Sequence, residues 1–121
     1  MNDIKIKENI IENDIIKERD TFQEIITACR KGMQKGIKLC QGDIGNYKTE
    51  ACPLGMVAQS SFYEDAEKKL NKDVIWTRGF YYGFDNMSLF ARYYSLNYSK
   101  NGYLIGQKVR QYFIDEGVDL K

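Results

Sequence analysis

The stretch ACPLGM, residues 51–56, contains the only proline of the chain and predicts a tightly packed helix entrance. Pro53 suits the first helical position because its missing N–H needs no partner there, and it restricts Cys52 to the extended geometry of an N-cap. Gly55 costs a helix up to about 1 kcal/mol relative to alanine. A glycine here therefore predicts that another backbone or a bulky side chain approaches closely.

Working outward from this entrance, the sequence predicts one helix from Pro53 to about residue 70, because apolar residues recur every four positions. Residues 37–40 predict a short strand before the entrance, and the glycine-punctuated segment 42–49 predicts a loop. The apolar residues of the expected helix are Leu54, Ala58, Phe62, Ala66 and Leu70, with Val57 and Tyr63 widening the same face.

An earlier helix is predicted over residues 22–35. Thr21 and Glu24 fit a capping box at its start, and Gly36 fits a left-handed cap at its end. Residues 1–20 are predicted to form a separate isoleucine-rich arm, in which neither the helical nor the strand period holds throughout. Exposed isoleucine pairs are unfavourable in water, so we expect the arm to fold back on its own domain, or else to lie on a partner. The apolar face of the predicted helix comprises Phe22, Ile25, Ile26, Cys29 and Met33.

The second half of the chain is rich in aromatic residues, twelve of which lie between Trp76 and Phe113. Residues 74–84 predict either a β-hairpin or a short helix that ends at Gly83. Asp85 is expected to cap a further helix. Asn101 and Gly102 are expected to break the chain before a last helix that ends near Gly117. The apolar face of the helix after Asp85 is predicted from Met87, Phe90, Ala91, Tyr94 and Tyr98.

These patterns predict a mostly helical α+β fold with about four helices and one or two short strands or a small hairpin. Residues 21–121 are expected to form a single compact domain. The composition is typical of a globular protein, with 43% hydrophobic residues, 29% charged residues and a net charge of +1. No apolar run suits a membrane span and no signal peptide is visible, so we expect a protein of the cytoplasm, or of the virion if a phage encodes it, without a membrane partner.

The residue types present exclude several kinds of catalytic site. The chain has no histidine, which rules out Ser-His-Asp and Cys-His arrangements, and it has no phosphate-binding glycine motif. Its cysteines, Cys29, Cys40 and Cys52, form no CxxC pair, so no metal or cofactor is expected. Cys52 at a helix N-terminus leaves one chemical alternative, because N–H groups there stabilise a thiolate. A small thiol-dependent enzyme or redox protein stays open beside the simpler interpretation of a buried cap.

The tyrosines point to binding. Two adjacent tyrosines of a regular helix or strand cannot both face one core, so some of the tyrosine side chains are expected to be exposed. Tyrosine is also enriched at protein interfaces. We therefore predict a non-enzymatic protein-interaction module that binds through exposed tyrosines and the N-terminal arm, with a host or viral protein or a second copy as its partner. Single-stranded nucleic acid is the other alternative, and it requires tyrosines beside arginines. The predicted binding residues are Tyr81, Tyr82, Tyr93, Tyr94, Tyr98, Arg78 and Arg92.

One pattern in the chain resembles short phage and bacterial proteins that carry C-[AP]-[LI]-G-[AM] at a helix start and G-[FN]-D further on. The resemblance covers roughly residues 22–90. It implies a small, mainly helical protein of phage type and no catalytic residue. As functions of the predicted interaction module, we expect a virion accessory or an inhibitor of a host protein. The residues that carry it are Cys52, Pro53, Leu54, Gly55 and Met56, followed by Trp76, Gly79, Gly83, Phe84 and Asp85.

Overall fold

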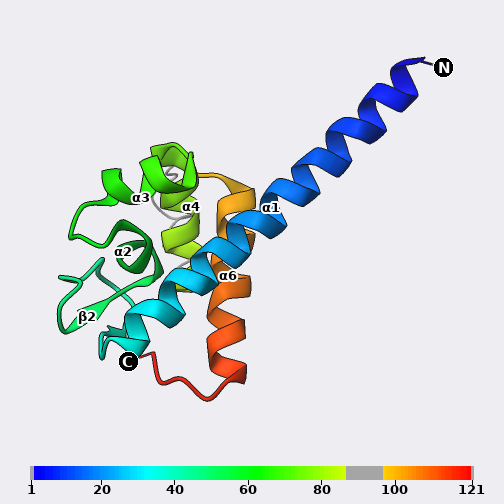
Figure 1. The fold of residues 1–121 in the computed structure, drawn as a ribbon. Coiled ribbons are helices and arrows are strands. Elements are labelled where there is room, and N and C mark those ends of the chain that lie inside the picture. Colours follow the sequence, from blue (N-terminus) through cyan, green and yellow to red (C-terminus); the bar gives the residue numbers. More distant parts are fainter. Residues whose placement is uncertain (1, 87–96, 121) are drawn as a thin grey trace.

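The computed structural model describes residues 2–86 and 97–120, with the backbone alone for residues 2–16. It is mostly helical with one small parallel sheet, which confirms the predicted α+β class. Figure 1 shows a long first helix lying across a cluster of shorter helices. The elements are α1 (Asn2–Gln34), β1 (Lys38–Leu39), β2 (Glu50–Ala51), α2 (Pro53–Ala58), α3 (Tyr63–Leu70), α4 (Val74–Phe84) and α6 (Lys100–Asp115).

Helix α2 lies at the centre of the core, and all six of its residues are buried. Cys52 has the extended geometry of an N-cap (φ −77°, ψ 172°) and Pro53 opens the helix, as the sequence predicts. The close approach predicted at Gly55 is also confirmed. A Cβ atom there would lie 2.2 Å from the carbonyl oxygen of Ile44, so only glycine admits this backbone contact.

The strands hold the loop that produces this contact. β1 and β2 run parallel, with Lys38 beside Glu50 and Leu39 beside Ala51, in agreement with the strand predicted over residues 37–40. The loop between them returns over the start of α2, where the Cys52 N–H donates to the Ile44 carbonyl oxygen over 3.1 Å. The loop is thereby fixed to the entrance of the buried helix.

Helix α1 corrects the prediction of a helix start at Thr21. The helix is continuous from Asn2, and the Thr21 hydroxyl donates to the Lys17 carbonyl oxygen over 2.8 Å. Threonine can satisfy its hydroxyl within a helix in this way, so it does not have to act as a cap. Residues 2–16 do not fold back on the domain, because Figure 1 shows them extending beyond it. The predicted end is confirmed, since Gly36 has a φ of 90°.

The single helix predicted over residues 53–70 is wrong, because the chain turns between α2 and α3. Gln59 adopts a left-handed conformation (φ 56°) and its N–H donates to the Gly55 carbonyl oxygen over 2.8 Å. The Ser60 hydroxyl then donates to the Asp65 carboxylate over 2.6 Å. This turn removes Phe62 from the predicted buried face and leaves it 68% exposed.

Residues 74–84 form helix α4, so the hairpin alternative is wrong and the helical one is confirmed. The Asp73 carboxylate accepts from the Trp76 N–H over 2.9 Å and caps the start of the helix. Asp85 ends α4, and the helix predicted after it lies largely outside the described residues.

The expected break at Asn101 and Gly102 is also wrong. Ser99 caps α6 instead, and its side chain accepts from the Gly102 N–H over 3.0 Å. The helix therefore starts at Lys100, and both residues lie in its first turn.

Helices α4 and α6 cross with their backbones in contact. The crossing uses glycines four positions apart on each helix. A Cβ atom at Gly83 would lie 2.0 Å from the Tyr103 carbonyl oxygen, and one at Gly106 would lie 2.3 Å from that of Phe80. The contact fixes the orientation of α4, which carries most of the site described next. The glycines are Gly79 and Gly83 of α4, and Gly102 and Gly106 of α6.

Candidate functional site

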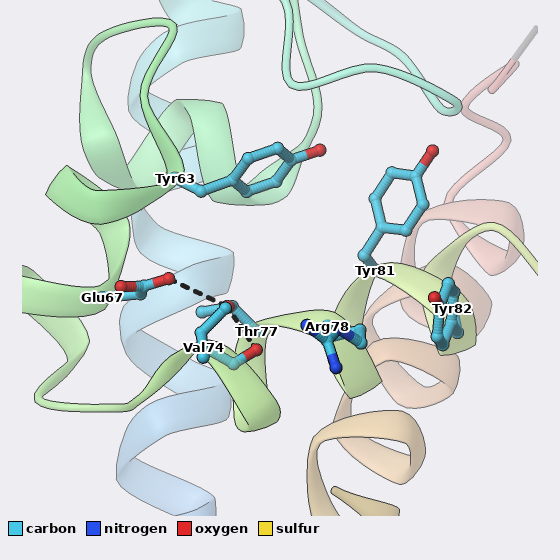
Figure 2. Close-up of a pocket in the computed structure, with 7 residues that line it drawn as sticks. All are labelled: Tyr63, Glu67, Val74, Thr77, Arg78, Tyr81 and Tyr82. Carbon is cyan, nitrogen blue, oxygen red and sulfur yellow. Dashed lines mark hydrogen bonds between the residues drawn. The ribbon is translucent and has the colours of Figure 1, made fainter. Parts of the chain in front are cut away.

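An open pocket of about 340 Å³ lies between α3 and α4. Figure 2 shows the two helices that form it, with Tyr63 and Glu67 coming from α3 and the remaining lining residues from α4. Concave sites lined by aromatic and aliphatic groups with a few polar atoms are typical of binding sites. The lining residues are Tyr63, Glu67, Val74, Thr77, Arg78, Tyr81 and Tyr82.

Helical spacing places the lining residues on one face of each helix. From Val74, the α4 residues Thr77, Arg78 and Tyr81 follow after three, four and seven positions, which is the repeat of one helical face. The Thr77 hydroxyl lies 3.3 Å from the Glu67 carboxylate and 3.1 Å from the Val74 carbonyl oxygen. This contact ties α3 to α4 at the base of the pocket.

Tyr63 and Tyr81 meet edge to face across the pocket, with ring centroids 6.2 Å apart and an interplanar angle of 89°. Burial raises the pKa of both phenols above the ordinary value, so both stay neutral near pH 7. The Tyr81 hydroxyl donates to the Gly42 carbonyl oxygen over 3.0 Å. The pocket thus offers neutral rings, one of which is fixed by the loop before β2.

Asp85 fixes the same loop from the end of α4. Its carboxylate oxygens accept from the Gly42 N–H over 3.1 and 3.2 Å. Desolvation raises the pKa of Asp85, while the bonds from Gly42 and Tyr81 and the charge of Arg110 oppose that rise. Arg110 donates to the Phe84 carbonyl oxygen over 2.8 Å. Asp85 is therefore a structural carboxylate, which holds the loop beside the tyrosines.

Arg78 supplies positive charge to the pocket wall. Its guanidinium donates to the Asn97 carbonyl oxygen over 2.7 Å. Among the described residues, the only ion pair within 4.0 Å joins Arg30 to Glu116, so no described carboxylate neutralises Arg78 at that distance. Within residues 17–86 and 97–120 this carbonyl oxygen is the hydrogen-bond acceptor of the guanidinium, which keeps other N–H groups for an incoming acceptor.

The structure brings three of the predicted binding residues together in the pocket: Arg78, Tyr81 and Tyr82. Tyr98 packs edge to face on Tyr82, with centroids 5.7 Å apart. The expected exposure of tyrosines needs correction, because Tyr82 is only 7% exposed and Tyr81 and Tyr98 are half-buried. Ring-to-ring packing covers part of each side chain. The remaining predicted residues, Arg92, Tyr93 and Tyr94, lie outside the described residues.

Sequence reasoning missed half of the pocket. Tyr63 was expected on the buried face of one long helix, and Glu67, Val74 and Thr77 were not singled out. The positions of Tyr63 and Glu67 depend on the turn at Gln59, which no residue pattern predicts. Val74 can be assigned to the first turn of α4, where it is exposed, only after Asp73 has been identified as the N-cap of that helix.

Cys52 lies in the core rather than in the pocket, and it is only 3% exposed. Desolvation raises its pKa to about 12, although the N–H groups of Gly55 and Leu54 oppose the rise. Burial raises the pKa of Cys29 and Cys40 as well. A nucleophilic cysteine needs a lowered pKa and access to substrate, so this environment gives no support to the thiol alternative.

Neither membrane spans nor metal clusters are found in the described part of the chain. No helix there combines the length and apolar character required to cross a bilayer. The described side chains include no group of three or more Cys, Asp or Glu placed to hold a metal ion. Comparison of the chain with known protein families, curated proteins and solved structures finds no match.

Proposed function

We propose that this protein is a non-enzymatic protein-interaction module that captures a partner through the α3–α4 pocket. The observation that carries the proposal is the convergence of Tyr63, Tyr81 and Tyr82 with Arg78 around one open cavity. Tyrosine and arginine dominate the residues that contribute most to protein–protein affinity. The partner is a host or viral protein, and the proposed origin in a phage or mobile element rests on the resemblance over roughly residues 22–90.

The pocket suits a projecting side chain of a partner. Its walls are largely apolar, and Val74 at the edge is 52% exposed. The tyrosine hydroxyls and Arg78 provide polar groups around this apolar surface. An aromatic or aliphatic side chain with a hydrogen-bond acceptor beside it would satisfy both features. Interfaces built in this way have an apolar centre and a polar rim.

Substitution of Val74 by glutamate tests the proposal. The change places a charge at the pocket edge on a half-exposed position, so the fold is expected to stay intact. We expect capture of the native partner, measured by quantitative pull-down from the producing host, to fall about tenfold or more, because a charge covered by the partner without a counter-charge is unfavourable.

Leu104→Glu is the matched control, because Leu104 is 53% exposed and lies on α6 outside this pocket. It should leave capture unchanged. Equal capture by the wild type and both variants would refute the proposed site, and equal loss in both variants would show a nonspecific effect of charge.

Single-stranded nucleic acid is a second candidate, because Arg78 lies beside Tyr81 and Tyr82 as that function requires. The net charge of +1 and the presence of Glu67 on the same wall favour a protein partner instead. Fluorescence anisotropy with labelled single-stranded DNA separates the two functions. Binding that weakens steeply with salt would support nucleic acid, and no binding at low salt would exclude it.

A further inference from the structure

The α3–α4 pocket, or tyrosine pocket, contains two opposite charges that do not pair with each other. Glu67 lines the pocket from α3, and Arg78 lines it from α4 (Figure 2). No ion pair within 4.0 Å joins them, because the one such pair among the described residues lies between Arg30 and Glu116. The pocket thus presents a carboxylate and, separately from it, a guanidinium.

Each charged group is held in place by an uncharged neighbour. The Thr77 hydroxyl lies 3.3 Å from the Glu67 carboxylate. The Arg78 guanidinium donates to the Asn97 carbonyl oxygen over 2.7 Å. A carboxylate has several lone pairs and a guanidinium has several N–H groups, so one contact leaves positions on each for a ligand. Both groups are therefore oriented and still able to bind.

The other charges around the pocket do not line it. Desolvation raises the pKa of Tyr63 and Tyr81, so both phenols are neutral near pH 7. The charges of Asp85 and Asp43 raise these pKa values further from outside the lining, and the charge of Arg110 partly offsets that of Asp85. The lining that the structure describes is therefore neutral overall. The charged residues of α3 and of the turn before α4 that also lie outside the lining are Glu64, Asp65, Lys68, Lys69, Lys72 and Asp73.

The rest of the lining is uncharged and largely apolar. The rings of Tyr63 and Tyr81 meet edge to face with their centroids 6.2 Å apart, and Val74 is exposed at the pocket edge. The volume of about 340 Å³ is at the small end of the range for ligand sites, which is roughly 300–1,000 Å³. These dimensions suit one small ligand that carries a single apolar group.

We propose that the tyrosine pocket also binds a free α-amino acid with an aromatic or branched aliphatic side chain. The ammonium group of this ligand binds the Glu67 carboxylate, its carboxylate binds the Arg78 guanidinium, and its side chain packs on the tyrosine rings. A neutral lining with separated charges favours a neutral ligand with separated charges. An acid, an amine or a nucleic acid would leave one charge of the pocket without a counter-charge. The effect of the ligand on partner capture rests on the proposed function, because both occupy one pocket.

Titration of the full chain with L-phenylalanine, followed by the NMR shifts of the backbone amides of α3 and α4, tests the proposal. We expect a dissociation constant of about 1 mM, which is typical of a ligand with about a dozen non-hydrogen atoms. Phenylalaninamide lacks the carboxylate and N-acetylphenylalanine lacks the ammonium group, so each should bind about tenfold more weakly. These derivatives also mimic the first and last residues of a polypeptide. Equal binding of either one would assign the pocket to a chain end and overturn the proposal.

Two variants test the roles of the charged groups. Glu67→Gln should lower the affinity for L-phenylalanine to that for N-acetylphenylalanine, and Arg78→Gln should lower it to that for phenylalaninamide. The matched controls are Glu64→Gln and Lys68→Gln, which remove exposed charges of α3 outside the lining and should leave all affinities unchanged. Equal weakening of all three ligands in both pocket variants, with unchanged circular dichroism, would overturn the proposal.

Comparison with the pull-down separates amino-acid binding from partner capture. Excess L-phenylalanine should lower capture of the partner, because the ligand and the partner occupy the same pocket. Absence of L-phenylalanine binding at millimolar concentrations, with capture still lost in Val74→Glu, would overturn the amino-acid site alone. Binding of L-phenylalanine with capture unchanged in Val74→Glu would support the amino-acid site and refute partner capture.

Discussion

Replacement of Gly83 by alanine tests the contact between α4 and α6 most directly. The added Cβ atom would lie 2.0 Å from the Tyr103 carbonyl oxygen, 2.8 Å from its carbonyl carbon and 3.0 Å from its Cα atom. All three are backbone atoms, so no side-chain rotation relieves the overlap. Because Cβ atoms do not approach within 3.0 Å of other heavy atoms, the two helices must separate by about 1 Å locally.

The expected cost follows from two opposing effects. Overpacking a core costs about 1–3 kcal/mol of stability. We expect a cost at the upper end of that range or beyond it, because the added Cβ atom overlaps backbone atoms, which cannot rotate away. Alanine returns up to about 1 kcal/mol through its better helix propensity. The free energy of unfolding of Gly83→Ala should therefore fall by about 2 kcal/mol or more. Urea unfolding followed by circular dichroism would show this as a midpoint lower by about 1 M.

Gly32→Ala is the matched control. Gly32 also lies inside a helix, and its Cβ atom would lie 2.2 Å from Met56, but the atom it meets is the side-chain sulfur. A methionine side chain can adopt another rotamer, so the expected cost is about 1 kcal/mol or less. Equal stability of Gly83→Ala and the wild type would refute the argument that direct backbone contact holds α4 on α6.

Three further predictions concern titratable groups. With a pKa of about 12, Cys52 is a thiolate in about one molecule in ten thousand at pH 8. In the native protein, Cys52 should therefore react with a thiol reagent only as fast as the protein unfolds. Rapid labelling of Cys52 would contradict this prediction. The pKa of Asp85 is raised in the folded protein, so its protonation stabilises the fold at a pH below 3.8, its pKa in the unfolded chain, and this stabilisation is lost as pH rises through the pKa of the folded state. Asp85→Asn should remove this loss from a plot of the free energy of unfolding against pH. An unchanged plot would contradict the prediction. Because both side chains are exposed and screened by water, the pair of Arg30 and Glu116 should contribute little to the free energy of unfolding. Glu116→Gln should therefore shift the thermal unfolding midpoint only slightly, and a large shift that persists in high salt would show a different role.

The sequence by itself determined the features whose causes are local. Pro53 has one good place in a helix, which fixed the start of α2 and the geometry of Cys52. Gly36 ends α1 because glycine readily adopts a positive φ. The requirement for close contact at Gly55 could also be predicted, since a glycine that weakens a helix indicates a neighbour. The identity of that neighbour, the Ile44 carbonyl, could not be predicted.

Only the tertiary structure decided which of the possible helix caps and turns actually form. Thr21 has the chemistry of a cap, but it bonds within a helix that continues to Asn2. Gln59 has no turn signature, yet it adopts a left-handed conformation that separates α2 from α3. These choices create the tyrosine pocket, because Tyr63 reaches Tyr81 only after that turn. Local propensities amount to about 1 kcal/mol or less per residue, whereas burial of a large apolar side chain contributes about 1.5–3 kcal/mol, so packing determines the outcome where the two conflict.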